Sequence, residues 1–261
     1  MARKDCPKCE GTGWRPIESD GVRRVTRCDC VEEEQSEQLL AQSRIPRRYE
    51  HCTFEDFDIR KDRSSGQDNR YLGVAKMYAQ KFVEEYPADF GLLFIGPAGA
   101  GKTHLAVALI RELMLRKNVP CLFYDFRDLL KTIQDSYNPV SQSSEFRVLQ
   151  PVLDVEVLLL DELAALNPSD WVKDTLGHII NTRYNNKNVT IITTTLPFET
   201  RVARGDVRSP SGEPVPEIDK SLNQYGVTFR SRLYEMCKVV EMYSDDYRKV
   251  IKHQDWRFRP G

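Results

Sequence analysis

Eight consecutive residues of the chain, 96–103, follow the pattern G-x-x-x-x-G-K-[ST], which brings backbone N–H groups and a lysine to phosphate groups. They are Gly96, Pro97, Ala98, Gly99, Ala100, Gly101, Lys102 and Thr103. The glycines let the backbone curl around phosphates, and the N-terminus of a following helix adds a favourable field. We expect Lys102 to contact the β- and γ-phosphates of ATP and Thr103 to ligate Mg²⁺.

The flanking residues decide between a nucleotide-binding loop and an incidental glycine-rich turn. Residues 91–96 (GLLFIG) have the pattern of a buried strand, and residues 103–117 have that of an amphipathic helix. This is the context that a phosphate-binding loop requires. His104, the next residue, is assigned to the same site, although a position on the helix face is the simpler interpretation of its ring.

Two carboxylates follow a second apolar strand, at residues 155–160. Asp161 and Glu162 would stand at its C-terminal end, where α/β proteins present ligands. We expect Asp161 to hold Mg²⁺ through its water shell, and Glu162 to orient or deprotonate an attacking water. The pair favours hydrolysis over phosphate transfer to a metabolite. The alternative is an acidic pair that begins a helix.

Four of the seven cysteines lie within the first 30 residues, at Cys6, Cys9, Cys28 and Cys30. Four thiolates at this spacing suit a tetrahedral Zn²⁺ of structural type, since no position is left open for water. A redox pair or unpaired thiols are the alternatives. The neighbouring Trp14, Arg15, Arg23, Arg24 and Arg27 give this module a basic and aromatic surface that could engage DNA or an acidic partner helix, or could simply be solvated.

The elements that position these motifs alternate along the chain from residue 54 onward. Short apolar runs separated by helical patterns predict an α/β fold with a parallel sheet and crossover helices. We expect strands at 91–96, 119–126, 155–160 and 189–195, helices at 103–117, 128–137 and 171–185, and a loop at 204–223. The predicted organisation is a zinc-binding module (1–31), a linker helix (32–45) and a nucleotide-binding domain (46–261).

The composition excludes a global electrostatic attraction to nucleic acid. The 38 Lys and Arg nearly cancel the 39 Asp and Glu, so that the net charge is -1. No apolar stretch approaches the roughly 20 residues that span a bilayer, and the N-terminus lacks the pattern of a signal peptide. We therefore expect a cytoplasmic protein whose cysteines stay reduced, with Cys52, Cys121 and Cys237 in the core.

Taken in order, the motifs resemble those of AAA+ ATPases of the bacterial helicase-loader type, DnaC-like or DnaI-like, and of the similar IstB-like transposition helpers. The resemblance covers most of residues 45–248. It rests on residues 45–49 (IPRRY), 54–57 (FEDF), 96–105 (GPAGAGKTHL), 159–163 (LLDEL), 193–198 (TTTLPF), 231–233 (SRL) and 246–248 (DYR). It implies a P-loop AAA+ sheet flanked by helices, and because the chain ends at Gly261 we expect no full lid domain.

The resemblance also implies roles for three residues beyond the two main motifs. Thr195 stands where the family usually has the sensor 1 asparagine, and a hydroxyl offers fewer hydrogen-bonding groups, so hydrolysis is expected to be slow. Arg232 resembles the arginine finger that reaches the γ-phosphate of a neighbouring subunit, which implies a homo-oligomer in the ATP state. Arg230 competes for that role, and either could be a surface charge. Arg248 resembles sensor 2.

Single-stranded DNA is a further ligand implied by the resemblance. The candidate contacts are Lys131, Tyr137, Ser169 and Trp171, because a base can stack on an aromatic side chain beside a cation. The alternative is that Tyr137 and Trp171 pack within the protein.

Three functions are consistent with these observations. The first is an ATP-hydrolysing helicase loader that docks on the replicative DNA helicase through its N-terminus and binds single-stranded DNA. The second is a transposition helper that binds duplex target DNA. The third is a nucleotide-dependent switch with negligible hydrolysis. The cysteine module favours the loader, since the resemblance implies a helical segment at the start of transposition helpers.

Overall fold

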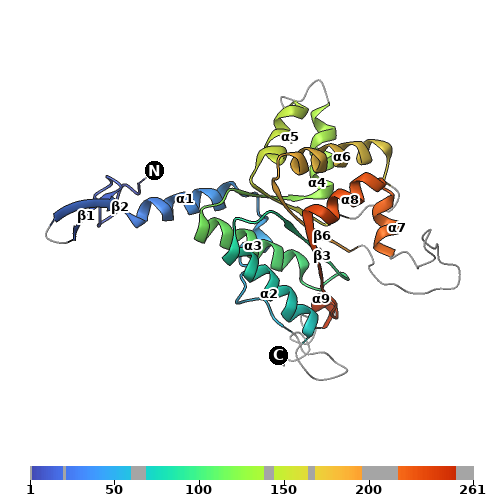
Figure 1. Ribbon diagram of the computed structural model, residues 1–261, viewed down its shortest axis with the longest axis horizontal. Coiled ribbons are helices and arrows are strands. Elements are labelled where there is room, and N and C mark those ends of the chain that lie inside the picture. Colours follow the sequence, from blue (N-terminus) through green and yellow to red (C-terminus); the bar gives the residue numbers. More distant parts are fainter. Residues whose placement is uncertain are drawn as a thin grey trace, which may run out of the picture.

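The centre of the protein is a five-stranded parallel sheet with the strand order β4-β5-β6-β3-β7 (Figure 1). The structure, a computed structural model, describes residues 2–19, 22–59, 69–137, 144–163, 168–195 and 217–250. The strands are β3 (Gly91–Ile95), β4 (Cys121–Asp125), β5 (Val157–Asp161), β6 (Val189–Thr194) and β7 (Cys237–Glu241). The predicted parallel α/β sheet flanked by helices is confirmed.

Helices cover both faces of this sheet. One face carries α2 and α3, and the other carries α4, α5, α6 and α8 (Figure 1). None of the described helices is long and apolar enough to cross a membrane. The helices are α1 (Asp29–Gln42), the 3-10 turn η1 (Arg47–Tyr49), α2 (Arg70–Glu85), α3 (Lys102–Lys117), α4 (Phe126–Ser136), α5 (Glu145–Asp154), α6 (Asp170–Asn185), α7 (Glu217–Asn223), α8 (Val227–Met236) and α9 (Tyr247–Val250).

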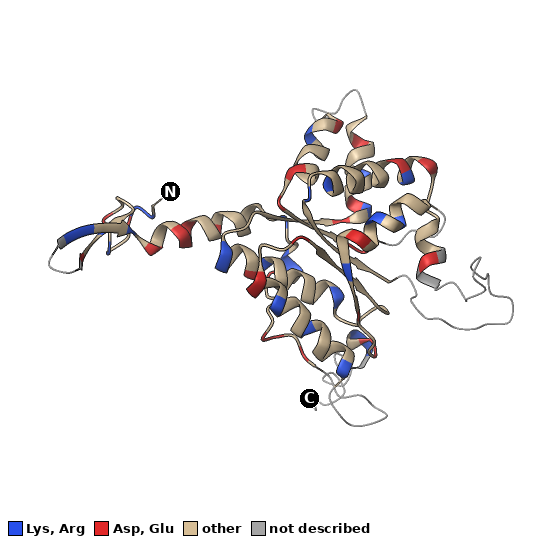
Figure 2. Cartoon of the chain, in the orientation of Figure 1, with Lys and Arg blue, Asp and Glu red and all other residues tan. Residues whose placement is uncertain are grey.

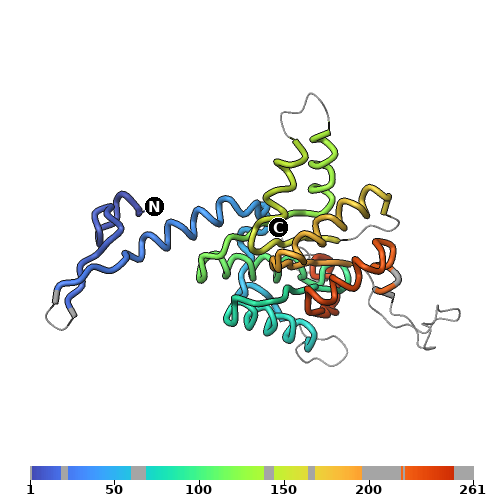
Figure 3. The backbone as a smooth tube through the Cα atoms, turned by 45° about the horizontal axis from the view of Figure 1, so that its top comes forward, coloured from blue at the N-terminus to red at the C-terminus, as the bar shows by residue number. Residues whose placement is uncertain are grey.

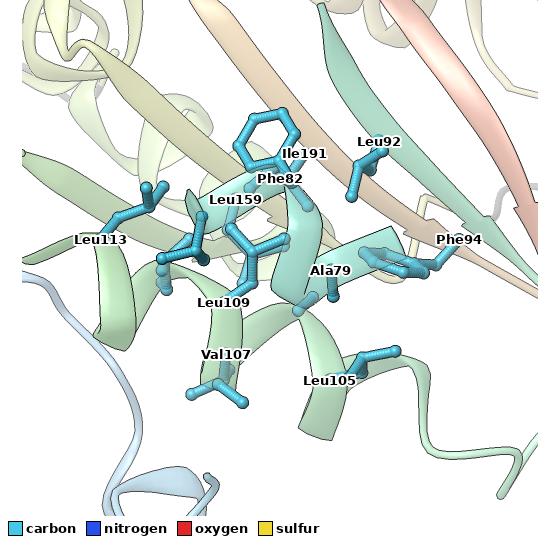
Figure 4. Close-up of a cluster of buried hydrophobic side chains, with 14 of the residues drawn as sticks. Ala79, Phe82, Leu92, Phe94, Leu105, Val107, Leu109, Leu113, Leu159 and Ile191 are labelled. Atoms are coloured by element: carbon cyan, nitrogen blue, oxygen red, sulfur yellow. The ribbon is translucent and has the colours of Figure 1, made fainter. Parts of the chain in front are cut away.

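Strand side chains alternate between two separate cores. In β3, Leu92 and Phe94 join the core beneath α2 and α3, whereas Leu93 and Ile95 join the core on the opposite face. This follows from the two-residue period of a strand, and it explains why the central strands are apolar throughout. Figure 4 shows the first core, in which side chains of α3 and α2 meet those of β3, β5 and β6.

Short polar side chains begin several of the helices. Asn69, Asp125, Ser144 and Ser169 each accept a hydrogen bond from a backbone N–H in the first turn of α2, α4, α5 and α6. These N-caps satisfy donors that the helix itself leaves free. Asn118 ends α3 in the left-handed conformation that asparagine tolerates.

Two elements differ from the predicted organisation. Helix α1 begins at Asp29, so that Cys30 lies in its first turn, and acidic Asp29 and Glu32 favour a helix start there. Residues 217–223 of the predicted loop form α7, and residues 204–216 lie outside the described residues. Residues 196–198 of the family-like segment and the chain end from 251 also lie outside them.

The N-terminal residues form an antiparallel hairpin of β1 (Trp14–Ser19) and β2 (Val22–Arg27). Two views place this hairpin away from the sheet, at the far end of α1 (Figures 1 and 3). Helix α1 packs on α3, where the buried Ser36 hydroxyl donates to Asn118 Oδ1 at 2.9 Å. The hairpin is therefore joined to the nucleotide-binding domain by a helix that is itself docked on α3.

Figure 2 shows basic residues on the N-terminal hairpin and acidic residues on α1. Their ion pairs divide the basic residues of this module into two groups. Arg3, Lys8 and Arg15 form ion pairs with acidic residues of α1, at distances between 2.7 and 3.9 Å. Arg23, Arg24 and Arg27 of the hairpin have no ion-pair partner among the described residues. The first group fixes the module on α1, and the second remains available to a ligand.

A fully buried arginine ties α6 to the segments around it. Arg183 donates to the carbonyl oxygens of Val152 and Val155 at 2.9 Å, to that of Val189, and to the hydroxyl of Thr190 at 2.9 Å. Burial lowers its pKa to about 9, so the guanidinium stays charged at neutral pH. These bonds satisfy carbonyl groups that would otherwise be buried without a partner.

Replacement of Arg183 by leucine should destabilise the fold by about 3 kcal/mol or more, because several buried carbonyls would lose their donor. Urea unfolding monitored by circular dichroism measures this change. Arg116→Leu is the matched control, since Arg116 is exposed and, among the residues that the structure describes, its ion pair is with Glu112 within α3. This variant should change stability by less than about 1 kcal/mol. Equal stability of the two variants would contradict the assigned role of Arg183.

Candidate functional site

The loop 96–101 joins the end of β3 to the start of α3, as its sequence predicts. Gly99 and Gly101 have φ angles of 78° and 99°, in a region that side chains other than glycine rarely adopt. A Cβ at Gly101 would also lie 2.9 Å from the ring of Phe57. The glycines at these positions are thus required by the shape of the loop. Pro97 and Ala98 at its tip are exposed, and Ala100 is buried.

The ammonium group of Lys102 lies inside this loop. Its Nζ donates to the carbonyl oxygens of Gly96 and Pro97, each at 2.8 Å. Burial lowers the pKa of Lys102, while the nearby Glu162 and Asp161 raise it. The cation is therefore held where the loop curls, beside the two carboxylates that follow β5.

Asp161 is the centre of a hydrogen-bond network that joins three elements. Its Oδ1 accepts from the Thr103 hydroxyl at 2.9 Å and from the Thr193 hydroxyl at 2.6 Å. Burial raises the pKa of Asp161, and the two hydroxyls lower it because they stabilise the charged form. Thr103 and Asp161, both expected to serve Mg²⁺, lie in direct contact, and their oxygen atoms are the ligand type that Mg²⁺ prefers.

Glu162 and Thr195 are the other predicted residues that the structure brings together here. The Thr195 hydroxyl donates to Glu162 Oε1 at 3.3 Å. Glu162 has a φ of 57°, which is uncommon for a residue with a side chain. This backbone turn separates Glu162 from the direction of β5, so its carboxylate faces the end of β6.

The C-terminal turn around α9 lies on the phosphate-binding loop. The Tyr247 N–H donates to Gly99 O at 3.2 Å, and a Cβ at Gly99 would overlap the carboxylate of Asp246. The Arg248 N–H donates to Asp246 Oδ1 at 3.0 Å, so Arg248 belongs to the turn that contacts the loop at Gly99. The sensor 2 role of its side chain stays a prediction.

Residues before the sheet also border the site. His104 Nε2 forms a hydrogen bond with Thr53 O at 2.9 Å, and its ring packs edge-on against Phe57. The His104 ring therefore contacts the 53–57 segment, and its backbone is what adjoins the loop. Burial raises the pKa of Tyr49, and charges on Asp161 and Arg248 also act on that hydroxyl.

The two candidate finger arginines lie on α8, on a different part of the surface. Arg232 donates to Asn181 Oδ1, and its guanidinium lies 5.3 Å from the ring centre of Tyr184 on α6. Arg230 forms an ion pair with Asp219 at 3.5 Å. Both side chains contact residues of their own chain. In a single protomer, an arginine that serves a neighbouring subunit would also rest on its own chain.

Of the four candidate DNA contacts, Tyr137 and Trp171 lie side by side. Their rings are 6.4 Å apart and nearly perpendicular, and Trp171 Nε1 donates to the Tyr137 hydroxyl at 3.4 Å. Ser169 caps α6, and Lys131 is exposed on α4. Tyr137 is 49% exposed and its hydroxyl donates to Glu145 at 2.7 Å, whereas Trp171 is partly buried and packs against the core on this face of the sheet.

The four N-terminal cysteines converge in one buried cluster. All four Sγ atoms lie within 4.8 Å of one another, with Cys6–Cys28 at 3.7 Å and Cys9–Cys30 at 3.5 Å. A zinc ion with Zn–S bonds of about 2.3 Å needs sulfur atoms about 3.8 Å apart, so the cluster fits zinc. The Gly13 N–H points at Cys9 Sγ, 3.4 Å away, which is typical support for a thiolate ligand.

The other three cysteines, Cys52, Cys121 and Cys237, are buried among apolar side chains as predicted. Two residues of the nucleotide site were not singled out from the sequence. Thr193 contacts Asp161, and Asp246 lies against Gly99. The run of three threonines at 193–195 was a usable signal for the first. Residue 246 lies in the family-like segment 246–248, but the resemblance assigns a role only to Arg248 within it.

Comparisons with known proteins agree with this geometry. A family model described as IstB-like ATP binding protein matches residues 29–206. The Phage-like element PBSX protein XkdC of Bacillus subtilis (strain 168) is 24% identical over 96% of this chain and 84% of its own length. The Replicative helicase loader DnaC of Buchnera aphidicola subsp. Schizaphis graminum is 31% identical over 59% of each chain. The crystal structure of the DnaC helicase loader has 26% identity and a TM-score of 0.61, covering 76% of this chain and 99% of its own.

The cysteine cluster predicts about one zinc ion per chain in purified protein, measured by mass spectrometry of the metal content. Cys9→Ser should remove most of that zinc, because a structural site needs all four ligands. Cys52→Ser, which alters a buried cysteine outside the cluster, should retain it. Equal zinc contents in the two variants would refute the assignment.

Proposed function

The chain belongs to the family of IstB-like ATP binding proteins, and from this premise we propose that it is an ATP-hydrolysing loader of a replicative DNA helicase. The observation that carries the proposal is the contact of Thr103 with Asp161, which joins the phosphate-binding loop to the acidic strand end. The similarity to the DnaC helicase loader structure, which is covered almost entirely, supports the choice of loader among AAA+ functions.

Each residue of the network has a role in the proposed hydrolysis. Lys102 and the loop N–H groups bind the phosphates of ATP, and Thr103 and Asp161 hold its Mg²⁺, which would neutralise developing charge when bound. Glu162 accepts a proton from the attacking water or orients it. Thr195 holds the Glu162 carboxylate, and because a hydroxyl is a weaker partner than a carboxamide, we propose slow turnover.

Two arginines complete the proposed site from different directions. Arg248 acts within its own chain, from the turn that contacts the loop at Gly99. Arg232 acts on the nucleotide of a neighbouring copy; in its own chain its guanidinium contacts Asn181 and Tyr184 of α6. The ATP-bound form is then a homo-oligomer in which each site needs two chains.

The N-terminal module is the proposed docking element for the helicase. Its hairpin exposes Trp14 at 56% and Val25 at 68%, together with Arg23, Arg24 and Arg27, which have no ion-pair partner in the described part of the chain. Exposed aromatic and apolar groups flanked by arginines are typical of the centre of a protein interface. The position of the hairpin at the far end of α1 leaves this surface clear of the nucleotide-binding domain.

Single-stranded DNA is the proposed ligand of the Tyr137 and Trp171 pair. The two rings offer a stacking surface at which each base could contribute about 1 to 3 kcal/mol. Lys131 on α4 would add positive charge for the DNA phosphates. Ser169, the N-cap of α6, is the fourth candidate contact.

The IstB-like family model also favours a second function, a transposition helper that binds duplex target DNA. Three of the four cysteines, Cys6, Cys9 and Cys28, precede the residues that this model matches, and the cysteine module is the feature that favours the loader. A switch with negligible turnover is the third possibility, and the Thr195 contact with Glu162 is the observation behind it.

Two substitutions separate binding from hydrolysis. Lys102→Ala should weaken ATP binding by roughly 100-fold, because it removes the cation that contacts the phosphates. Glu162→Gln should leave ATP binding within a few-fold of the wild type and reduce turnover about 100-fold or more. Fluorescent-nucleotide titration and phosphate release measure the two effects. If Glu162→Gln hydrolyses ATP at the wild-type rate, Glu162 is not the catalytic base.

The docking proposal predicts that the full chain binds purified replicative helicase in a pull-down. The double variant Trp14→Ala, Val25→Ala should reduce that binding at least about 10-fold, because these are the exposed apolar groups of the hairpin. Tyr234→Ala, at an exposed aromatic on α8, is the control and should bind as the wild type does. Absence of helicase binding, together with coating of duplex DNA, would favour the transposition helper instead.

A further inference from the structure

Thr193 contacts Asp161, the last residue of β5, and the two residues that follow it. Its hydroxyl donates to Asp161 Oδ1 at 2.6 Å and accepts from the Glu162 N–H at 2.9 Å. Its carbonyl oxygen accepts from the Leu163 N–H at 2.8 Å. The side chain is fully buried, so no water competes for these bonds. One residue of β6 therefore determines the path of the chain from Asp161 to Leu163.

The hydrogen bond to the Glu162 N–H holds the residue of this segment that has the least favourable backbone conformation. Glu162 has a left-handed backbone, with a φ of 57°, a conformation that costs free energy for a residue with a side chain. Such a conformation persists where its surroundings hold it. The Thr193 hydroxyl bonds the N–H of the strained residue itself, and that residue carries the carboxylate facing Thr195.

The second hydrogen bond of the Thr193 hydroxyl restricts the carboxylate of Asp161. Thr103 on α3 and Thr193 on β6 both donate to Oδ1, from opposite motifs of the site. With two donors on one oxygen, the carboxylate has a defined orientation toward Thr103. A single hydroxyl thus connects the group expected to hold Mg²⁺ with the backbone of the group expected to activate water.

We propose that Thr193 is a positioning residue for ATP hydrolysis, which sets Asp161 and Glu162 relative to each other through its one hydroxyl. The inference rests on the proposed hydrolytic function and adds a residue to it. Thr193 touches neither phosphate nor water; it acts by holding the two residues that do. Removal of its hydroxyl leaves Asp161 with one donor fewer and frees the Glu162 turn to change its conformation.

A purely structural hydroxyl is available on the same strand for comparison. Thr190 is also buried in β6, and its hydroxyl accepts a hydrogen bond from Arg183 Nε at 2.9 Å, away from the nucleotide site. Thr190→Val and Thr193→Val are the same isosteric change, a buried hydroxyl replaced by a methyl group. Any cost to folding that is common to such a change should be present in both.

Four proteins test the proposal: the wild type, Thr193→Val, Thr193→Ser and Thr190→Val. The measurements are steady-state ATP hydrolysis, the affinity for a fluorescent ATP analogue in Mg²⁺ and in EDTA, and thermal unfolding. For Thr193→Val we expect kcat to fall about 10- to 100-fold with KM for ATP within about 3-fold of the wild type, the range seen when a supporting hydrogen bond to a functional group is lost. The difference between the affinities of Thr193→Val for the ATP analogue in Mg²⁺ and in EDTA should also be smaller than that of the wild type.

The serine variant keeps the hydroxyl, so it should recover kcat to within about 3-fold of the wild type. Thr190→Val should lower the unfolding temperature and leave kcat unchanged. Wild-type kcat and wild-type Mg²⁺ dependence in Thr193→Val would overturn the inference, as would a serine variant as slow as valine. A wild type that binds ATP without hydrolysing it would instead refute the proposed hydrolysis, and the Mg²⁺ dependence of binding would then decide the role of Thr193 by itself.

Discussion

The buried carboxylate of Asp161 is the point on which the arrangement of the site depends. Removing a charge from water is costly, and here two threonine hydroxyls offset that cost from α3 and from β6. The strand order makes this possible, because β6 lies between β5 and β3 and its end reaches both motifs. The phosphate-binding loop, the acidic pair and the threonine run are therefore held in one fixed relation by a few short hydrogen bonds.

The motifs and central strands could be predicted because their patterns are local. Strands β3, β5 and β6 lie within two residues of the expected positions, since a strand covered on both faces is continuously apolar. Helix α3 was expected because its apolar residues fall on one helical face and basic residues end it. The cysteine cluster followed from spacing alone, because the i, i+2 and i, i+3 pairs can turn their sulfur atoms to one point.

The remaining features depend on contacts between residues distant in sequence. Arg183 has the pattern of a charged helix residue, yet it is fully buried because α6 packs beside two segments, at residues 152–156 and 189, whose carbonyls need a donor. Asp246 reaches Gly99 only through the course of β7 along β3. Helix α7 occupies part of a segment rich in polar residues and prolines, where tertiary contacts outweigh local preference.

Because α1 is docked on α3, its length and rotation set the position of the N-terminal hairpin relative to the sheet. With 14 residues it is about 21 Å long, and its packing on α3, which includes the Ser36 contact with Asn118 and the partial burial of Leu39 and Leu40, sets its position and rotation. Each residue of a helix turns the chain by about 100°, so the direction in which the hairpin faces is set by the number of residues between Cys30 and Ser36. Length and phase of α1 thus specify where, and at what angle, anything held by the hairpin stands relative to the nucleotide.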